Sequence, residues 1–173
     1  MGFVFETVYD IKTLTAMAKA LRKTVRKKKS RRAHILGPII IVVGLLLSFM
    51  PDENGVIIDG RAIITWIVVV IMLAALIWED KINAFFAQKR LLKGTECSRA
   101  IFEENNYVTE TEIGKTVWEY SKITDIVETK DYFVFVFSHN HAQAHRKSSV
   151  SESDLVSFRE FLEDRTLKKI RSI

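Results

Sequence analysis

Two long stretches of this chain contain no Asp, Glu, Lys or Arg, and they limit its possible folds more than any other feature. Ile35–Met50 holds 11 Ile, Leu, Val or Phe residues, and Ala62–Trp78 holds 10 Ile, Leu or Val residues. A helix of about 17 to 19 residues is about 26 to 28 Å long, close to the roughly 30 Å hydrocarbon core of a bilayer. The rest of the chain is too short to bury two such helices in a soluble core. The pattern therefore predicts a transmembrane hairpin.

The charges that flank the two runs predict the orientation of this hairpin. The loop between them carries Asp52, Glu53 and Asp59 against Arg61 alone. Basic residues follow the second run, and a cluster of them precedes the first: Arg22, Lys23, Arg26, Lys27, Lys28, Lys29, Arg31 and Arg32. Positively charged side chains stay on the cytoplasmic side of a membrane. We therefore expect a multi-pass protein of the cell membrane with both termini in the cytoplasm.

The basic cluster has two interpretations that the sequence leaves open. It acts only as a topology determinant, or it also binds the anionic headgroups of membrane lipids, at about 1 kcal/mol for each nearby Lys or Arg. Nucleic acid is the other polyanion that a basic run suggests. Because this run lies directly beside a predicted membrane segment, we expect lipid headgroups and no nucleic acid as its partner.

The segments outside the two runs predict a mixed helix and sheet structure. Alternating apolar residues from Phe3 to Ile11 predict a strand, and the spacing of Leu14, Met17, Leu21 and Val25 predicts an amphipathic helix after it. Beyond Trp78 a helical period continues to Gly94 as a stalk. From there the period becomes that of strands, with turns expected at 105–106, at Gly114 and at 130–131.

The last strand and helix of the chain show the clearest patterns. Tyr132–Phe137 reads YFVFVF and is apolar on both faces, which is typical of a strand covered on both sides. A helix then follows with Ser151 as its cap and a buried stripe of Leu155, Phe158, Phe161 and Leu162. Antiparallel strands followed by one amphipathic helix form the plan of pleckstrin-homology-type (PH-like) modules.

This part of the sequence resembles a known family. The segment from Tyr120 to Ser138, a basic pair after it, and Leu155–Leu162 look like the carboxy-terminal domain of the YcxB-like family of bacterial membrane proteins. Tyr120 stands where that family usually carries tryptophan, and His145-Arg146-Lys147 stands where proline and basic residues are usual. The resemblance implies a fold and a membrane address, and it supplies no catalytic residue.

The predicted fold class is an α+β membrane protein, with a two-helix transmembrane hairpin and a cytoplasmic PH-like antiparallel sheet or barrel that ends in a helix. The predicted parts are a cytoplasmic strand and basic amphipathic helix (1–33), transmembrane helix 1 (34–50), an extracytoplasmic loop (51–61), transmembrane helix 2 (62–78), a juxtamembrane stalk helix (79–94) and the cytoplasmic YcxB-like domain (95–173). Small residues in the two runs, such as Gly37 and Gly44, allow close helix packing, within the hairpin or between copies.

The sequence shows no convincing catalytic or metal-binding pattern. His139, His141 and His145 have a loose ligand spacing, but a polar hairpin explains them better, because Arg146 and Lys147 follow and oppose a cation. No glycine-rich phosphate loop, nucleophile elbow or HExxH motif is present. We therefore expect no enzyme activity, no cofactor and no metal.

The expected function is a membrane-anchored interaction module whose cytoplasmic domain binds a protein or a lipid headgroup. Its expected partners are membrane lipids at the basic cluster and an unidentified membrane or cytoplasmic protein. The alternative is an accessory subunit of a membrane transport or export complex, in which the two spans make the contacts.

Overall fold

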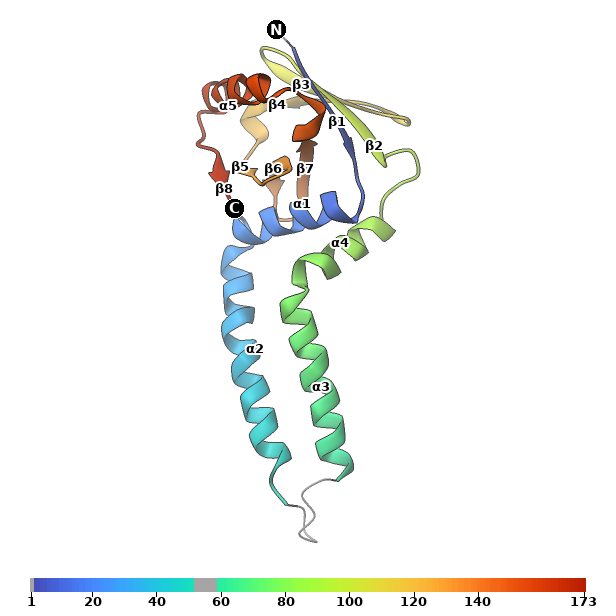
Figure 1. The fold of residues 1–173 in the computed structure, drawn as a ribbon, viewed down its shortest axis with the longest axis vertical. Coiled ribbons are helices and arrows are strands. Elements are labelled where there is room, and N and C mark those ends of the chain that lie inside the picture. Colours follow the sequence, from blue (N-terminus) through green and yellow to red (C-terminus); the bar gives the residue numbers. More distant parts are fainter. Residues whose placement is uncertain (1, 52–58) are drawn as a thin grey trace.

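The computed structural model describes residues 2–51 and 59–173, and it combines a helix and sheet domain with a pair of long helices (Figure 1). Most of the predicted loop 51–61, residues 52–58, lies outside the described residues. The helices are α1 (Ile11–Lys23), α2 (Lys27–Ser48), α3 (Gly60–Ile77), α4 (Glu79–Lys89) and α5 (Glu152–Thr166). The strands are β1 (Phe3–Val8), β2 (Cys97–Phe102), β3 (Asn106–Thr111), β4 (Gly114–Glu119), β5 (Asp125–Glu128), β6 (Tyr132–Ser138), β7 (His141–Arg146) and β8 (Arg171–Ser172).

Helices α2 and α3 are each long and apolar enough to cross a membrane. Only 17% of the most apolar window of α2 and 11% of that of α3 are buried, whereas the core helix of a soluble protein would be mostly buried. A Cβ added to Gly37 would lie 2.8 Å from Cδ1 of Leu76, and Trp66 Nε1 donates a 3.0 Å hydrogen bond to Ser48 Oγ. In this structure the small residues thus serve packing within the hairpin.

The first sheet joins two parts of the sequence that the hairpin separates. Its strand order is β1-β2-β3-β4, and β1 pairs antiparallel with β2, with Phe5 opposite Ala100. The predicted strand at the amino end is confirmed over Phe3–Val8, but Ile11 belongs to α1. The turn expected at Gly114 is formed by residues 112–113, and Gly114 begins β4.

The second sheet has the strand order β7-β6-β5-β8, and its last pair, β5 with β8, is parallel. Among the described residues the two sheets remain separate and do not close into one barrel. The prediction that β6 is covered on both faces is confirmed. Phe133 and Phe135 pack in one core cluster, and Val134 and Val136 pack in another against Leu21 of α1.

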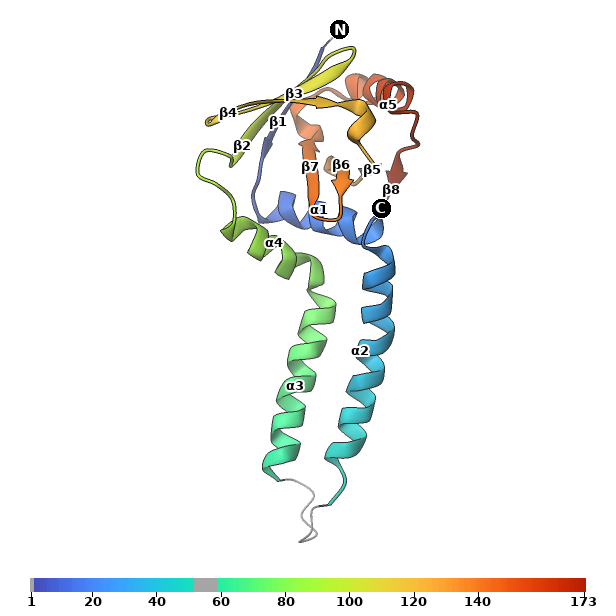
Figure 2. The same ribbon diagram turned by 180° about the vertical axis from the view of Figure 1, so that it is seen from behind.

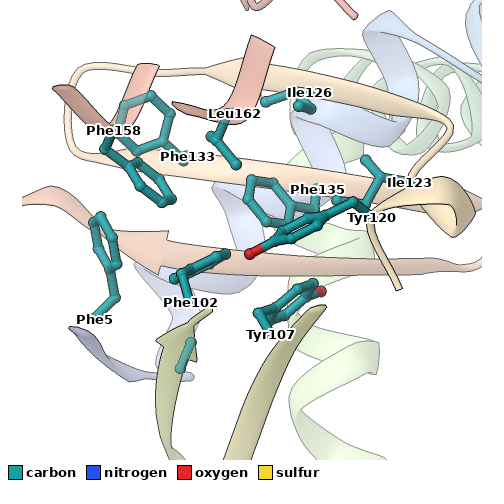
Figure 3. Packing of buried hydrophobic residues seen from close by; sticks show 11 residues of the cluster. Phe5, Phe102, Tyr107, Tyr120, Ile123, Ile126, Phe133, Phe135, Phe158 and Leu162 are labelled. Atoms are coloured by element: carbon teal, nitrogen blue, oxygen red, sulfur yellow. The ribbon is translucent and has the colours of Figure 1, made fainter. Parts of the chain in front are cut away.

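The larger core is aromatic and lies between the two sheets and α5 (Figure 3). It draws its buried side chains from both sheets and from α5: Phe5, Ala100, Phe102, Tyr107, Tyr120, Ile123, Ile126, Phe133, Phe135, Phe158 and Leu162. The predicted cap of α5 is confirmed, because Ser151 Oγ accepts a hydrogen bond from the amide of Asp154. Tyr120 Oη donates to the carbonyl of Glu103 at 2.7 Å, which fixes this aromatic residue in the domain.

The helix that follows α3 differs in extent and direction from the stalk predicted over 79–94. Trp78 takes φ −103° and ψ 22°, which ends α3, and α4 then turns away from the axis of α3 to lie beside α1 (Figures 1 and 2). The helix stops at Lys89, and Gly94, with φ +84°, follows it in a turn. Helices α1 and α4 together form the base of the domain, from which α2 and α3 extend.

Candidate functional site

The base of the domain is held together by an ion pair between α1 and α4. Arg22 donates two hydrogen bonds to Asp80, from Nε to Oδ1 and from Nη2 to Oδ2, both at 2.7 Å. These bonds outweigh partial burial and raise the pKa of Arg22. Such a bidentate pair fixes orientation as well as distance, so it sets the angle at which α4 crosses α1.

The eight basic residues of the predicted cluster divide into three groups in the structure. Arg22 is committed to Asp80. Arg26, at the link between α1 and α2, donates to the carbonyl of His139 at 2.6 Å and to Asn140 Oδ1 at 2.9 Å. The side chains of the others are exposed around the end of α1 and the first two turns of α2: Lys23, Lys27, Lys28, Lys29, Arg31 and Arg32.

A groove lies where α1, α4 and the β6–β7 turn meet. Its first hollow, of about 540 Å³, has an apolar wall and four polar corners. The wall is formed by Leu14, Met17, Ala18, Leu21, Phe86, Ala87 and Ala142. The polar corners are Arg26 and Arg90 with two amides, Asn83 and Asn140.

A second hollow, of about 480 Å³, continues the first toward α2. The two share Arg26, Asn83 and Asn140, and the second adds Lys29 and Glu79. We call the two together the helix-junction groove. Apolar walls with a few convergent polar groups are typical of small-molecule binding sites.

The groove carries an excess of positive charge. Within residues 2–51 and 59–173, Arg26, Lys29 and Arg90 form no ion pair. The carboxylate on its wall, Glu79, accepts a 3.1 Å hydrogen bond from Ser30 Oγ and lies 4.0 Å from Arg22 Nε. Arg26 is held by two neutral oxygens, so its position is fixed without its charge being neutralised. The arrangement suits an anion that also carries apolar groups.

The outer face of α4 continues this amphipathic character. Ile82, Phe85 and Phe86 recur at helical spacing and are exposed, and Lys89 Nζ lies 4.5 Å from the centre of the Phe85 ring. Leu92 is exposed just beyond the helix. An apolar stripe bordered by lysines is the pattern of a helix that lies in the interface between lipid and water.

The three candidate metal ligands do not come together. His145 is buried in the aromatic core, with its ring centre 4.6 Å from that of Phe135. His141 stacks on Phe137 at 4.9 Å, and His139 is exposed at the β6–β7 turn. No group of three or more His, Cys, Asp or Glu side chains suited to a metal ion occurs in the part of the chain that the structure describes.

The basic pair after His145 is used inside the domain as well as at its surface. Lys147 is hydrogen bonded to Glu128, and Arg159 Nη2 donates to the same carboxylate at 2.6 Å. Partial burial opposes the charge of Glu128, but the two cations outweigh it and lower the pKa of this carboxyl. Arg146 is exposed, and its amide donates to Thr7 Oγ1 of β1 at 3.0 Å.

The sequence pattern did not predict the groove-lining residues that do not belong to the basic cluster. Asn83, Arg90 and Asn140 lie far from that cluster in sequence. One signal was present: Asp80 and Glu79 are the first acidic residues after an uncharged run, which marks them as partners for nearby cations.

Comparisons with known proteins give a family match over part of the chain and a distant likeness to solved structures. Residues 102–162 match the family model described as "YcxB-like protein", and no curated protein matches. A solved structure described as "Structure of the Spt16D Pob3N heterodimer" is similar with a TM-score of 0.37 and 9% identity, over 47% of this chain and 47% of that chain. The family match includes the stretch from Tyr120 to Leu162 where the sequence showed its resemblance, and it begins before that stretch, at Phe102.

Proposed function

Because residues 102–162 carry a YcxB-like domain, and a groove rich in cations borders that domain at its base, we propose that this protein is a membrane-anchored module that binds an anionic phospholipid. The groove takes up the phosphate of the headgroup, and the acyl chains lie along the apolar surface of the neighbouring helices. The observation that carries the proposal is the set of three cations that line the groove, Arg26, Lys29 and Arg90, none of which forms an ion pair among the described residues.

Two features support insertion of α2 and α3 in a bilayer. Most of their apolar side chains are exposed, including Ile39, Ile40, Val70 and Ile71, and water would hydrate such a surface at a large cost. The strand before the hairpin pairs with the strand after it. This pairing supports a topology in which both ends of the hairpin lie on one side of the membrane, and the basic residues favour the cytoplasm as that side.

Two further features support a lipid headgroup as the ligand. Five basic residues lie in the first turns of α2, where the helix dipole disfavours positive charge. An anionic membrane surface offsets that cost. The amides of Asn83 and Asn140 supply donors beside Arg26 and Arg90, and a phosphate diester accepts several hydrogen bonds at once.

The test is retention of lipid by the purified full chain. Delipidated protein is titrated with phosphatidylglycerol or phosphatidylcholine and followed by native mass spectrometry. We expect preference for phosphatidylglycerol in the wild type. Replacing Arg26 and Arg90 with glutamine is expected to weaken phosphatidylglycerol binding about 30-fold, from about 1 kcal/mol for each cation removed.

The matched control is the double replacement Lys122→Gln and Lys169→Gln, which removes the same charge from exposed positions in the domain. It should leave lipid binding within about twofold of wild type. Inorganic phosphate at millimolar concentration should not displace the lipid, because it offers nothing to the apolar wall. Equal loss in both double variants, or displacement by free phosphate, contradicts a specific lipid site.

An accessory subunit of a transport or export complex remains the alternative function, since the exposed faces of α2 and α3 also suit contact with other membrane helices. That function predicts that exchanging both spans for unrelated apolar helices abolishes assembly with other membrane proteins. The lipid-binding function predicts that the same exchange leaves phosphatidylglycerol retention in place, because Arg26 and Arg90 lie outside the two spans.

A further inference from the structure

The first sheet ends in a strand whose outer edge is open. Strand β4 pairs with β3 on one side, and no described strand pairs with it on the other. Its register with β3 runs through six consecutive pairs without a bulge, and β4 contains no proline. Soluble proteins usually protect such an edge with a bulge, a proline or a covering segment.

The backbone groups at this edge belong to alternate residues of β4. Thr111 lies opposite Gly114 across the two-residue turn 112–113, and the residues that flank a two-residue turn exchange hydrogen bonds. Gly114, Thr116 and Trp118 therefore direct their N–H and C=O groups toward β3. Those of Lys115, Val117 and Glu119 point away from the sheet.

Exposed side chains accompany this open backbone. Val117 is 62% exposed, and it ends an apolar row across the outer face of the sheet that runs through Val4, Ile101 and Val108, each opposite the next. A parallel row alternates in charge: Glu6, Arg99, Glu110 and Lys115. Both rows stop at β4.

We propose that the edge of β4 pairs with β4 of a second copy of this chain, antiparallel and centred on Val117. In that register Val117 faces Val117 of the second copy, and Lys115 faces Glu119 in both directions. All three residues present edge-facing backbone groups, so the pairing forms a regular ladder and joins the two sheets into one.

Charge selects this register over its neighbours. Centring the pair on Lys115 places two lysines opposite each other, and centring it on Glu119 places two glutamates opposite each other. Centring the pair on Thr116 or on Trp118 places Val117 opposite Lys115 or opposite Glu119. The register centred on Val117 alone gives two opposite-charge pairs, and directly opposite like charges destabilise a sheet. Lys115 already pairs with Glu110 on β3, so Glu119 of the second copy continues the alternating row.

The position of β4 allows both copies to lie in one membrane. Strands β3 and β4 cross the molecule at the end opposite α2 and α3 (Figure 2). A twofold axis that passes through this edge along the direction of the long helices keeps both helix pairs pointing the same way, as closed twofold symmetry requires of two copies in one bilayer.

The first test is disulfide crosslinking of the full chain in membranes, with Cys97→Ser to remove the native thiol. Val117→Cys is expected to give a crosslinked dimer on mild oxidation, since directly paired Cα atoms lie about 5.5 Å apart. Ile113→Cys is the matched control, because its side chain is 61% exposed. In the proposed register its two copies lie about 27 Å apart, from eight residues at roughly 3.4 Å each. Equal crosslinking of the two variants, or none of Val117→Cys, overturns the proposal.

The second test exchanges the charges. Lys115→Glu and Glu119→Lys alone are each expected to weaken dimerisation at least tenfold, measured by light scattering of the full chain in detergent. The double exchange restores the opposite-charge pairs and should return the dissociation constant to within about threefold of wild type. A monomeric wild type, or a double exchange no better than the single ones, overturns the proposal. The proposal is also overturned if the edge of β4 binds an extended peptide of another protein and not a second copy of this chain. Since neither test touches Arg26 or Arg90, each proposal stands or fails on its own.

Discussion

Phe5→Ala is expected to lower the free energy of unfolding of the domain by about 3 to 5 kcal/mol, the usual cost of truncating a fully buried phenylalanine. Phe5 is fully buried although its strand precedes the helical hairpin. Its ring centre lies 4.5 Å from that of Phe158 and 5.6 Å from that of Phe102. The cavity would therefore open at the centre of the aromatic core.

Hydrogen exchange of the full chain in detergent micelles measures this effect, through the protection of the buried amides of β6. Val8→Ala on the same strand is the control, because Val8 is 46% exposed and its truncation should cost about 0.5 kcal/mol or less. Equal loss of protection in both variants would show that β1 does not contribute to the core in the way its contacts indicate.

The second large effect concerns His145 and acid. Burial lowers the pKa of His145 to about 3, and its Nε2 has no hydrogen-bond partner among the residues that the structure describes. In the unfolded chain the group titrates near pH 6.5. Above that pH both states are neutral and pH has no effect through this residue. As the pH falls from about 6.5 to about 3, only the unfolded state gains a proton, so the domain loses stability.

The variant His145→Leu isolates this effect. Relative to wild type, it should gain about 2 kcal/mol in unfolding free energy between pH 7.5 and pH 5, from one group with these two pKa values. Denaturant titrations of both proteins at the two pH values give the difference. His139→Leu, at an exposed position on the preceding turn, is the matched control. A constant difference between His145→Leu and wild type across this range would mean that His145 is accessible to protons in the folded domain.

The elements with strong periodic patterns could be predicted from the sequence. The two faces of β6, the buried stripe of α5 and its cap at Ser151 are examples, because each depends on the spacing of a few residues along one segment. The two long apolar helices also belong here, since their length and composition are local properties.

The features that depend on distant residues could not be predicted. Nothing near Phe5 indicates that its partner strand begins at Cys97. The two-residue strand β8 is too short to carry a period, and it forms because β5 offers it an edge. The course of the predicted stalk helix over 79–94 could not be predicted for a similar reason: Asp80 pairs with Arg22 of α1, and this contact directs α4 along the base of the domain.

The candidate site was predicted only in part, for the same reason. The basic cluster is visible as a run of charges, but its division into committed and free cations depends on Asp80 and on the β6–β7 turn. The groove itself is made where three segments cross, and none of them shows a binding motif by itself.

The pairing of β1 with β2 has a consequence for biogenesis. During translation β1 is synthesised well before its partner strand β2, because Phe5 pairs with Ala100, which is 95 positions later in the sequence. At about 5 to 20 residues per second this delay is about 5 to 19 s, with the apolar faces of β1 and α1 uncovered. In the proposed membrane topology, a nascent chain that places only one helix across the bilayer leaves the two strands in different compartments. In that topology the first sheet therefore closes only after both helices have crossed.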